Sequence, residues 1–189
     1  MDIDETLVTI LESAAGKAFK ALQEEHTEEQ FYYFALLNDG NWRPYISAWS
    51  REALERFYEE NEVEDEEKGW YRWSGVESPY MAYGWDEYFA EYEDFLFETE
   101  QKHCEADDDT ADAMWKTLLN SMEEAMRRLD QKGIFGTGAA RDQVVIAVEL
   151  VPPARSNYTR TERLNKSGLI REFLDENADL LEEDAEEQR

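Results

Sequence analysis

The sequence predicts an α+β fold, in which a small and mainly antiparallel sheet packs against several helices. Three observations support this prediction: a hairpin signal over residues 30–49, an apolar run over residues 143–151, and several segments in which apolar residues recur at helical spacing. The chain shows no repeat and no linker. Residues 1–182 are therefore expected to form a single α+β domain, followed by an acidic C-terminal tail over residues 183–189.

The first third of the chain carries signals for a helix, a hairpin and a second helix. Apolar residues near the N-terminus keep helical spacing and predict one amphipathic helix over residues 4–25. The β-rich stretches FYYFALL and PYISAWS flank an Asp-Gly pair, which predicts an antiparallel hairpin. Ser50 is then the expected N-cap of a short helix from Arg51 to about Glu60.

The middle of the chain is expected to contain an extended segment followed by two helices. WYRWS, residues 70–74, is expected to be a short strand or an extended segment. From Trp85 onward, aromatic and acidic residues separate onto opposite sides of a predicted helix. Asp109 is the expected cap of the next helix, a long one that ends at Gly133.

The last third of the chain is expected to hold one strand and two helices. QVVIAVELV is a continuous apolar run, typical of a central strand that is buried on both faces. Thr159 and Glu162 have the spacing of a capping box and predict a helix around residues 162–165. A final helix is expected from Gly168 to about Leu181.

The charge of the chain limits the classes of partner. With 19 basic and 46 acidic residues, the formal net charge is −27. Proteins bind nucleic acid and anionic lipid through Lys and Arg, so this charge argues against nucleic-acid and membrane partners. The expected partner is a basic protein, because complementary charge accelerates its association.

The expected location is cytoplasmic. The N-terminal segment is acidic and amphipathic, and it lacks the basic region of a secretory signal. A single cysteine, Cys104, cannot form a disulfide within the chain, which is typical of proteins in a reducing compartment.

The sequence gives little support for catalysis. His26 and His103 are the two histidines, and His103 adjoins Cys104, which disfavours a dyad because sequence neighbours rarely face each other. HCEADDD lacks the ligand spacing of known metal sites. GIFGTGAAR follows a predicted helix, whereas phosphate-binding glycine loops follow a strand. We therefore expect no enzyme, no catalytic residue, no cofactor and no bound metal.

The most acidic segment directly precedes a cluster of aromatic residues. Seven carboxylates fall within the nine positions 59–67, and WYRW follows shortly after. Aromatic anchors with an acidic rim would suit an interface with a basic protein. The predicted partner-binding residues are Glu59, Glu60, Glu62, Glu64, Asp65, Glu66, Glu67, Trp70 and Tyr71. Trp73 is expected to lie in the core instead.

Two other interpretations of this acidic segment remain open. It could be a solvated loop whose charges only keep the protein soluble. If residues 59–67 were helical, they would span about 13.5 Å at about 1.5 Å per residue. Seven charges on that length approach the spacing of duplex DNA, about 1.7 Å per charge, and predict an acidic nucleic-acid mimic that inhibits a nuclease or a DNA-binding protein.

One basic segment stands out against the acidic composition. ARSNYTRTERLNKSGLIR carries Arg155, Arg160, Arg163, Lys166 and Arg171. These residues could hold an anionic ligand. We expect them instead to pair with acidic residues of the same chain, because the remaining surface repels itself.

Several of these segments together resemble a bacterial family of small acidic domains. They are FYYFALLNDGNWRPYISAWS, WYRWSGVESPY, the aromatic and acidic helix, and VVIAVELV. The resemblance extends from about Phe31 to Leu174, and its most specific part is Arg72, Trp73 and Ser74. Members of that family occur beside polymorphic toxin genes as presumed immunity proteins.

The resemblance implies a binding protein and no catalytic residues. An immunity protein neutralises its cognate antibacterial toxin domain by covering the active surface or the target-docking surface. The expected partner is therefore a cognate toxin, basic in charge and bound one to one.

Overall fold

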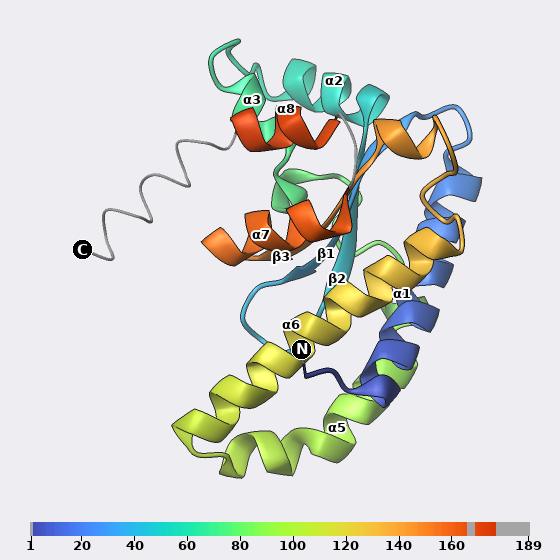
Figure 1. The fold of residues 1–189 in the computed structure, drawn as a ribbon. Helices are drawn as coiled ribbons and strands as arrows, with labels where there is room; N and C mark the ends of the chain where they lie inside the picture. Colours follow the sequence, from blue (N-terminus) through green and yellow to red (C-terminus); the bar gives the residue numbers. More distant parts are fainter. Residues whose placement is uncertain (1, 166–168, 177–189) are drawn as a thin grey trace.

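The computed structural model describes residues 2–165 and 169–176. Within this part of the chain, a three-stranded sheet is surrounded by eight α-helices (Figure 1), which confirms the α+β class. The helices are α1 (Glu5–Glu25), α2 (Arg51–Glu60), α3 (Lys68–Arg72), α4 (Trp85–Tyr88), α5 (Ala90–Glu105), α6 (Asp108–Gln131), α7 (Arg155–Leu164) and α8 (Leu169–Glu176). The strands are β1 (Phe31–Asn38), β2 (Tyr45–Ser50) and β3 (Val145–Leu150).

The sheet is mixed, with β1 at its centre in the order β2-β1-β3. β1 pairs antiparallel with β2, as the hairpin signal predicts, and parallel with β3. The prediction that β3 is a central strand is wrong. Its residues form an apolar run because protein covers both faces of this small sheet, so an edge strand has the same pattern as a central one.

Successive residues of β1 face the two layers that enclose the sheet. Phe34 packs against Phe19 of α1, with ring centroids 5.3 Å apart, and also against Phe135 at 5.1 Å. Tyr33 points the other way and meets Trp73 at 5.8 Å. The alternation along β1 therefore places α1 on one face and the segment around Trp73 on the other.

The helices gather in two groups around the sheet. α1 and α6 pack together along one side, while α5 and the first part of α6 extend away from the sheet (Figure 1). α2, α3 and α8 lie together at one end of the sheet (Figure 1). No helix in the described ranges has both the length and the apolarity that a membrane span requires.

α7 covers the outer edge of β3 with two asparagine side chains. Asn157 accepts from the Leu150 N–H at 3.0 Å and donates to the Leu150 carbonyl at 2.9 Å. Asn165 likewise accepts from the Ile146 N–H at 3.0 Å and donates to the Ile146 carbonyl at 2.7 Å. Each amide imitates one residue of a further strand, so part of the exposed edge is already hydrogen-bonded.

Predictions of helix ends are confirmed where the signal is local. Ser50 caps α2, because its hydroxyl accepts from the Ala53 N–H at 2.9 Å. Gly133, with φ of 77°, ends α6 as expected. The cap of α6 is Asp107 rather than Asp109, because the Asp107 carboxylate accepts from the Thr110 N–H at 2.9 Å.

Two predictions in the middle of the chain are wrong. The WYRWS segment is not extended, because residues 68–72 form α3 and tertiary packing outweighs the β preference of aromatic residues. The helix expected from Trp85 is divided into α4 and α5 at Phe89. Phe89 is fully buried, so the break turns its ring into the core.

The C-terminal helices also differ from the prediction. α7 starts at Arg155, so the Thr159 and Glu162 pair lies inside the helix and forms no capping box. The hydroxyl of Thr159 donates to the Ser156 carbonyl instead. The end of the predicted last helix, residues 177–181, and the predicted tail lie outside the described residues.

Candidate partner-binding site

Arg72, Trp73 and Ser74 fix the position of the segment that carries the candidate site. The Arg72 guanidinium forms an ion pair with Glu176 of α8 at 3.0 Å. Trp73 is only 3% exposed, which confirms its predicted place in the core. The Ser74 carbonyl accepts from the Trp49 indole N–H at 2.8 Å. These contacts tie α3 to α8 and to the sheet.

Residues 59–67, called the acidic arm below, form the end of α2 and the turn that follows. α2 ends at Glu60, and the Val63 N–H donates to the Tyr58 carbonyl at 3.0 Å. Glu62 has φ of 52°, the left-handed conformation of a Schellman turn. The acidic arm is therefore not a continuous helix, and the duplex-like charge spacing that a helix would give it is absent.

The acidic arm is exposed and is left almost without counter-charges. All seven of its carboxylate side chains are on exposed residues. In the described ranges, Asp65 alone among these acids forms an ion pair within 4 Å, with Lys68 at 2.7 Å. That pair is itself solvent-exposed, so it is worth little.

Several acids of the arm lie where they lower the stability of the fold. Glu59 and Glu60 occupy the last turn of α2, which contains no basic residue. The partial negative charge of a helix C-terminus repels each carboxylate by about 0.3–1 kcal/mol. The left-handed backbone at Glu62 costs about 1 kcal/mol more for a residue with a side chain. Such violations of local preference are expected at functional positions.

The two predicted aromatic anchors differ in availability. Trp70 is 55% exposed, one of the few large apolar side chains that the fold leaves open to solvent. Tyr71 is half-buried and packs against Phe57, with ring centroids 5.1 Å apart. The structure therefore leaves Trp70 free to anchor a partner, whereas Tyr71 mainly supports the fold.

A small cavity lies beside Trp70, between α3, the end of β3 and α7. Its volume is about 70 Å³, and Trp70, Trp73, Val76 and Glu149 are among the residues that line it. Glu149 comes from β3 and carries the only carboxylate among the lining residues. The cavity thus combines aromatic walls with one acidic group.

Glu149 is held by two hydrogen bonds and has no cationic partner among the described residues. The Tyr33 hydroxyl and the Gly75 N–H donate to its carboxylate. Burial raises the pKa of the Glu149 carboxyl to about 7, although both hydrogen bonds act in the opposite direction. No Lys or Arg of the described ranges forms an ion pair with it, and the residue as a whole is half-buried.

Sequence reasoning missed Glu149. The apolar residues of VVIAVELV predict a buried strand, and the same stretch contains one carboxylate. A charged residue is almost never buried without a partner, so this one could have been recognised as exceptional.

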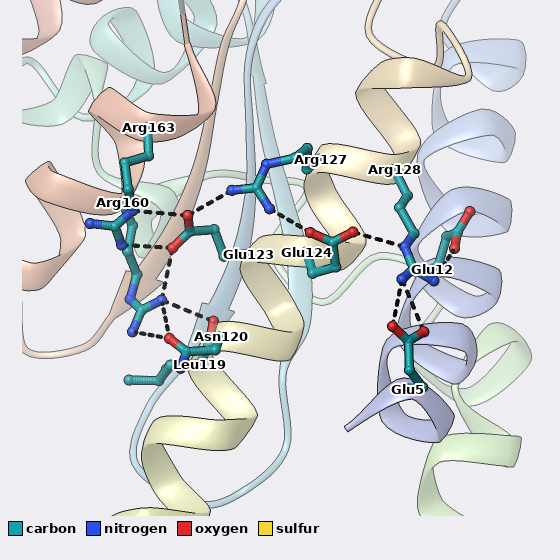
Figure 2. Close-up of polar contacts among 10 residues, drawn as sticks. All are labelled: Glu5, Glu12, Leu119, Asn120, Glu123, Glu124, Arg127, Arg128, Arg160 and Arg163. Atoms are coloured by element: carbon teal, nitrogen blue, oxygen red, sulfur yellow. Dashed lines mark hydrogen bonds and ion pairs between the residues drawn. The ribbon is translucent and has the colours of Figure 1, made fainter. Parts of the chain in front are cut away.

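The basic residues of α7 serve a different part of the molecule. Figure 2 shows the fully buried Glu123 of α6 facing Arg127, Arg160 and Arg163. Arg163 approaches Glu123 at 2.7 Å and Arg160 at 2.9 Å. The predicted internal pairing of the basic segment is therefore confirmed for these two arginines. Arg171 is exposed, and Lys166 lies outside the described residues.

This network continues as a ladder of alternating charges across α1, α6 and α7 (Figure 2). Arg127 bridges Glu123 and Glu124, and Arg128 bridges Glu124 and Glu5 of α1 at 2.9 Å. The arginines of the ladder are thus occupied within the fold. They cannot neutralise the acidic arm.

The sequence also predicts that a metal site is absent, and the relevant side chains of the described residues are as follows. None of their His, Cys, Asp and Glu side chains form a group of three that could hold a metal ion. The side chains of His103 and Cys104 lie outside what the structure describes.

The fold and the site define an α+β protein with an exposed acidic arm beside an open tryptophan. Comparison with protein families then identifies the family. Residues 11–166, most of the chain, match the Domain of unknown function (DUF4303), and the chain belongs to that family. Comparisons with curated proteins and with solved structures gave no match.

Proposed function

We propose that this protein is a cytoplasmic immunity protein that binds and neutralises a cognate antibacterial toxin domain. One observation carries the proposal: seven exposed carboxylates, of which only Asp65 is paired within the described ranges, adjoin the exposed Trp70. A surface built in this way repels itself in the free protein. A basic partner would relieve that repulsion on binding.

In this proposal, charge and apolar contact make different contributions to binding. The acidic arm would speed encounter with a basic surface, an effect that salt weakens. Trp70 would supply the desolvated anchor, since tryptophans are enriched among residues that cost about 2 kcal/mol or more when truncated. Together they would cover the active or target-docking surface of the toxin in a one-to-one complex.

The alternative function, a nucleic-acid mimic, stays a prediction. Its physical basis was a helical acidic arm, and the structure shows a turn after Glu60. A mimic would compete with DNA for its target, and its affinity would fall steeply with salt.

Co-expression with the product of the adjacent gene tests the proposal. The expected result is that growth arrest by that product is abolished and that the two proteins elute as a one-to-one complex. A matched variant with Glu62, Glu64, Glu66 and Glu67 changed to Gln should protect less well. Unrelieved toxicity, together with the absence of a complex, would refute the proposed function.

A further inference from the structure

The cavity beside Trp70 has features of a receptor for a single cationic side chain. We propose that it receives an arginine of the partner, whose guanidinium pairs with Glu149 and lies against the Trp70 ring. This inference rests on the proposed function, because it takes the partner to be a basic protein. It adds which group of the partner enters the site and where it binds.

The size of the cavity favours a side-chain end over a longer segment. Its volume is about 70 Å³. A water molecule takes about 30 Å³ in the liquid, so the cavity has room for the head group of one side chain. Arginine fits the surroundings, because its planar guanidinium can both pair with a carboxylate and stack on an aromatic ring.

Glu149 retains capacity to accept hydrogen bonds. An ionised carboxylate has about four lone-pair sites, and the donors found here are the Tyr33 hydroxyl and the Gly75 N–H. The remaining sites can accept from a guanidinium. In the described ranges no cation of this chain forms an ion pair with Glu149, so an incoming arginine would meet an unpaired acid.

The surroundings of the cavity would draw in a cation. Trp70 lines it and lies three positions after Glu67, the last acid of the acidic arm. The arm thus places exposed negative charge next to Trp70 in the chain. Arg72, whose guanidinium lies 5.0 Å from the centroid of the Trp73 ring, is itself paired with Glu172 and Glu176 of α8. A guanidinium within about 6 Å of an indole ring gains about 0.5–2 kcal/mol from the interaction with its face.

Protonation of Glu149 should be linked to arginine binding. Its pKa is about 7 without a cation, and an adjacent guanidinium would lower that pKa. Tyr158 of α7 lines the same cavity. Among the described residues, two further phenols are coupled to Glu149: Tyr33 on β1, which donates to it, and Tyr45 on β2, whose pKa is raised by burial, by Asp39 and by Glu149. Both phenol pKa values are shifted upward, so neither group titrates near neutral pH. Arginine should therefore bind more tightly as the pH rises through about 7.

Binding of small probes tests this inference without the partner. N-acetyl-arginine amide would be titrated into the whole protein, with N-acetyl-citrulline amide as the neutral control of the same shape. The indole N–H signals of Trp70 and Trp73 report binding by nuclear magnetic resonance. We expect roughly tenfold preference for the arginine probe, in line with an ion pair and a cation–π contact. The preference should shrink as the pH falls from about 8 to about 6.

Variants test which residues cause the preference for the arginine probe over the citrulline probe. Glu149→Gln keeps an acceptor for the Tyr33 hydroxyl and should bind both probes equally at every pH. Trp70→Ala should weaken binding of the arginine probe. Glu77→Gln, a change at an exposed acid on the same segment, should alter the binding of neither probe. Equal binding of the two probes by the unchanged protein would overturn the inference, whether or not a variant folds.

The outcomes separate this inference from the proposed function. If Glu149→Gln and Trp70→Ala both form the toxin complex normally, the arginine-binding inference is refuted, while the proposed immunity function is not affected. Conversely, selective arginine binding without any toxin complex would support the receptor and refute the proposed function.

Discussion

Trp70 and Trp73 stand three positions apart in the chain, and their environments are opposite. Trp73 is 3% exposed and contacts Tyr32, Tyr33 and Phe173, whereas Trp70 is 55% exposed. A continuous α-helix would place residues three positions apart on the same face, but α3 ends at Arg72, and Trp73 beyond its end is turned into the core while Trp70 faces solvent. Residue type alone therefore does not assign a role to either tryptophan.

Alanine at each position should separate core from interface. Trp73→Ala removes a buried ring and should lower the free energy of unfolding by about 3–5 kcal/mol. Trp70→Ala should lower it by less than about 1 kcal/mol, because its ring is mostly solvated. Urea titration followed by circular dichroism measures both. A large loss of stability in Trp70→Ala would show that this ring belongs to the core and not to a binding surface.

Glu123 is the residue on which the charge ladder of α1, α6 and α7 depends. Burial alone would raise its pKa, but the hydrogen bond and charge of Arg163, with the charges of Arg160 and Arg127, lower it. A carboxyl whose pKa is lowered by folding stabilises the protein above its unfolded pKa. That stabilisation is lost as the pH falls through the folded pKa.

Glu123→Gln should therefore be strongly destabilising at neutral pH. It leaves Arg160, which is largely buried, without its carboxylate, and we expect a loss of about 3–5 kcal/mol. The difference in the free energy of unfolding between this variant and the unchanged protein should become smaller as the pH falls below about 4. Glu5→Gln, at the exposed end of the same ladder, should cost no more than about 1 kcal/mol. Equal effects of the two changes, measured by denaturant unfolding, would contradict this account.

At the scale of elements, α7 performs two structural tasks. Its arginines pair with α6, and Asn157 together with Asn165, just after the helix, bonds the outer edge of β3. Unprotected strand edges favour pairing between molecules. The two asparagines thus stabilise the sheet and block part of its exposed side.

Replacing both asparagines by alanine should expose that edge. The N–H groups of Ile146 and Leu150 lose their acceptors, and each unsatisfied buried group costs about 1–3 kcal/mol. Hydrogen exchange at these two amides should accelerate more than exchange at amides within α1. Unchanged exchange at Ile146 and Leu150 would show that the asparagines do not protect the edge.

The elements that could be predicted from sequence are those specified by neighbouring residues. The hairpin around Asp39-Gly40, the Ser50 cap and the Gly133 helix end all depend on contacts within a few positions. The position of β3 in the sheet and the start of α7 depend on partners far along the chain. Patterns within a segment contain no information about such partners.

The candidate site was predictable to the same degree. The exposure of the acidic arm follows from its own charge density, and the sequence also placed Trp73 in the core. The pairing of Glu149 with Tyr33 could not be predicted, because it joins segments that only the fold brings together. The Glu149 cavity was therefore missed.

At the scale of the whole molecule, the net charge of −27 is unevenly compensated. Arginines such as Arg128 and Arg160 hold helices together, while the acidic arm retains one exposed ion pair among the described residues. Because charges farther apart than about 8 Å are largely screened at physiological salt, local clusters dominate encounter with a partner. The charge density of the acidic arm therefore supports the proposal that it attracts a basic protein.

The rate of association with the product of the adjacent gene tests this claim most directly. The comparison is between the unchanged protein and a variant with Glu62, Glu64, Asp65, Glu66 and Glu67 neutralised together to Gln and Asn. At low salt, we expect the association rate constant to fall by roughly tenfold or more, with the two rates converging at high salt and the stability not reduced. An association rate that is the same for both proteins at low salt would contradict the account.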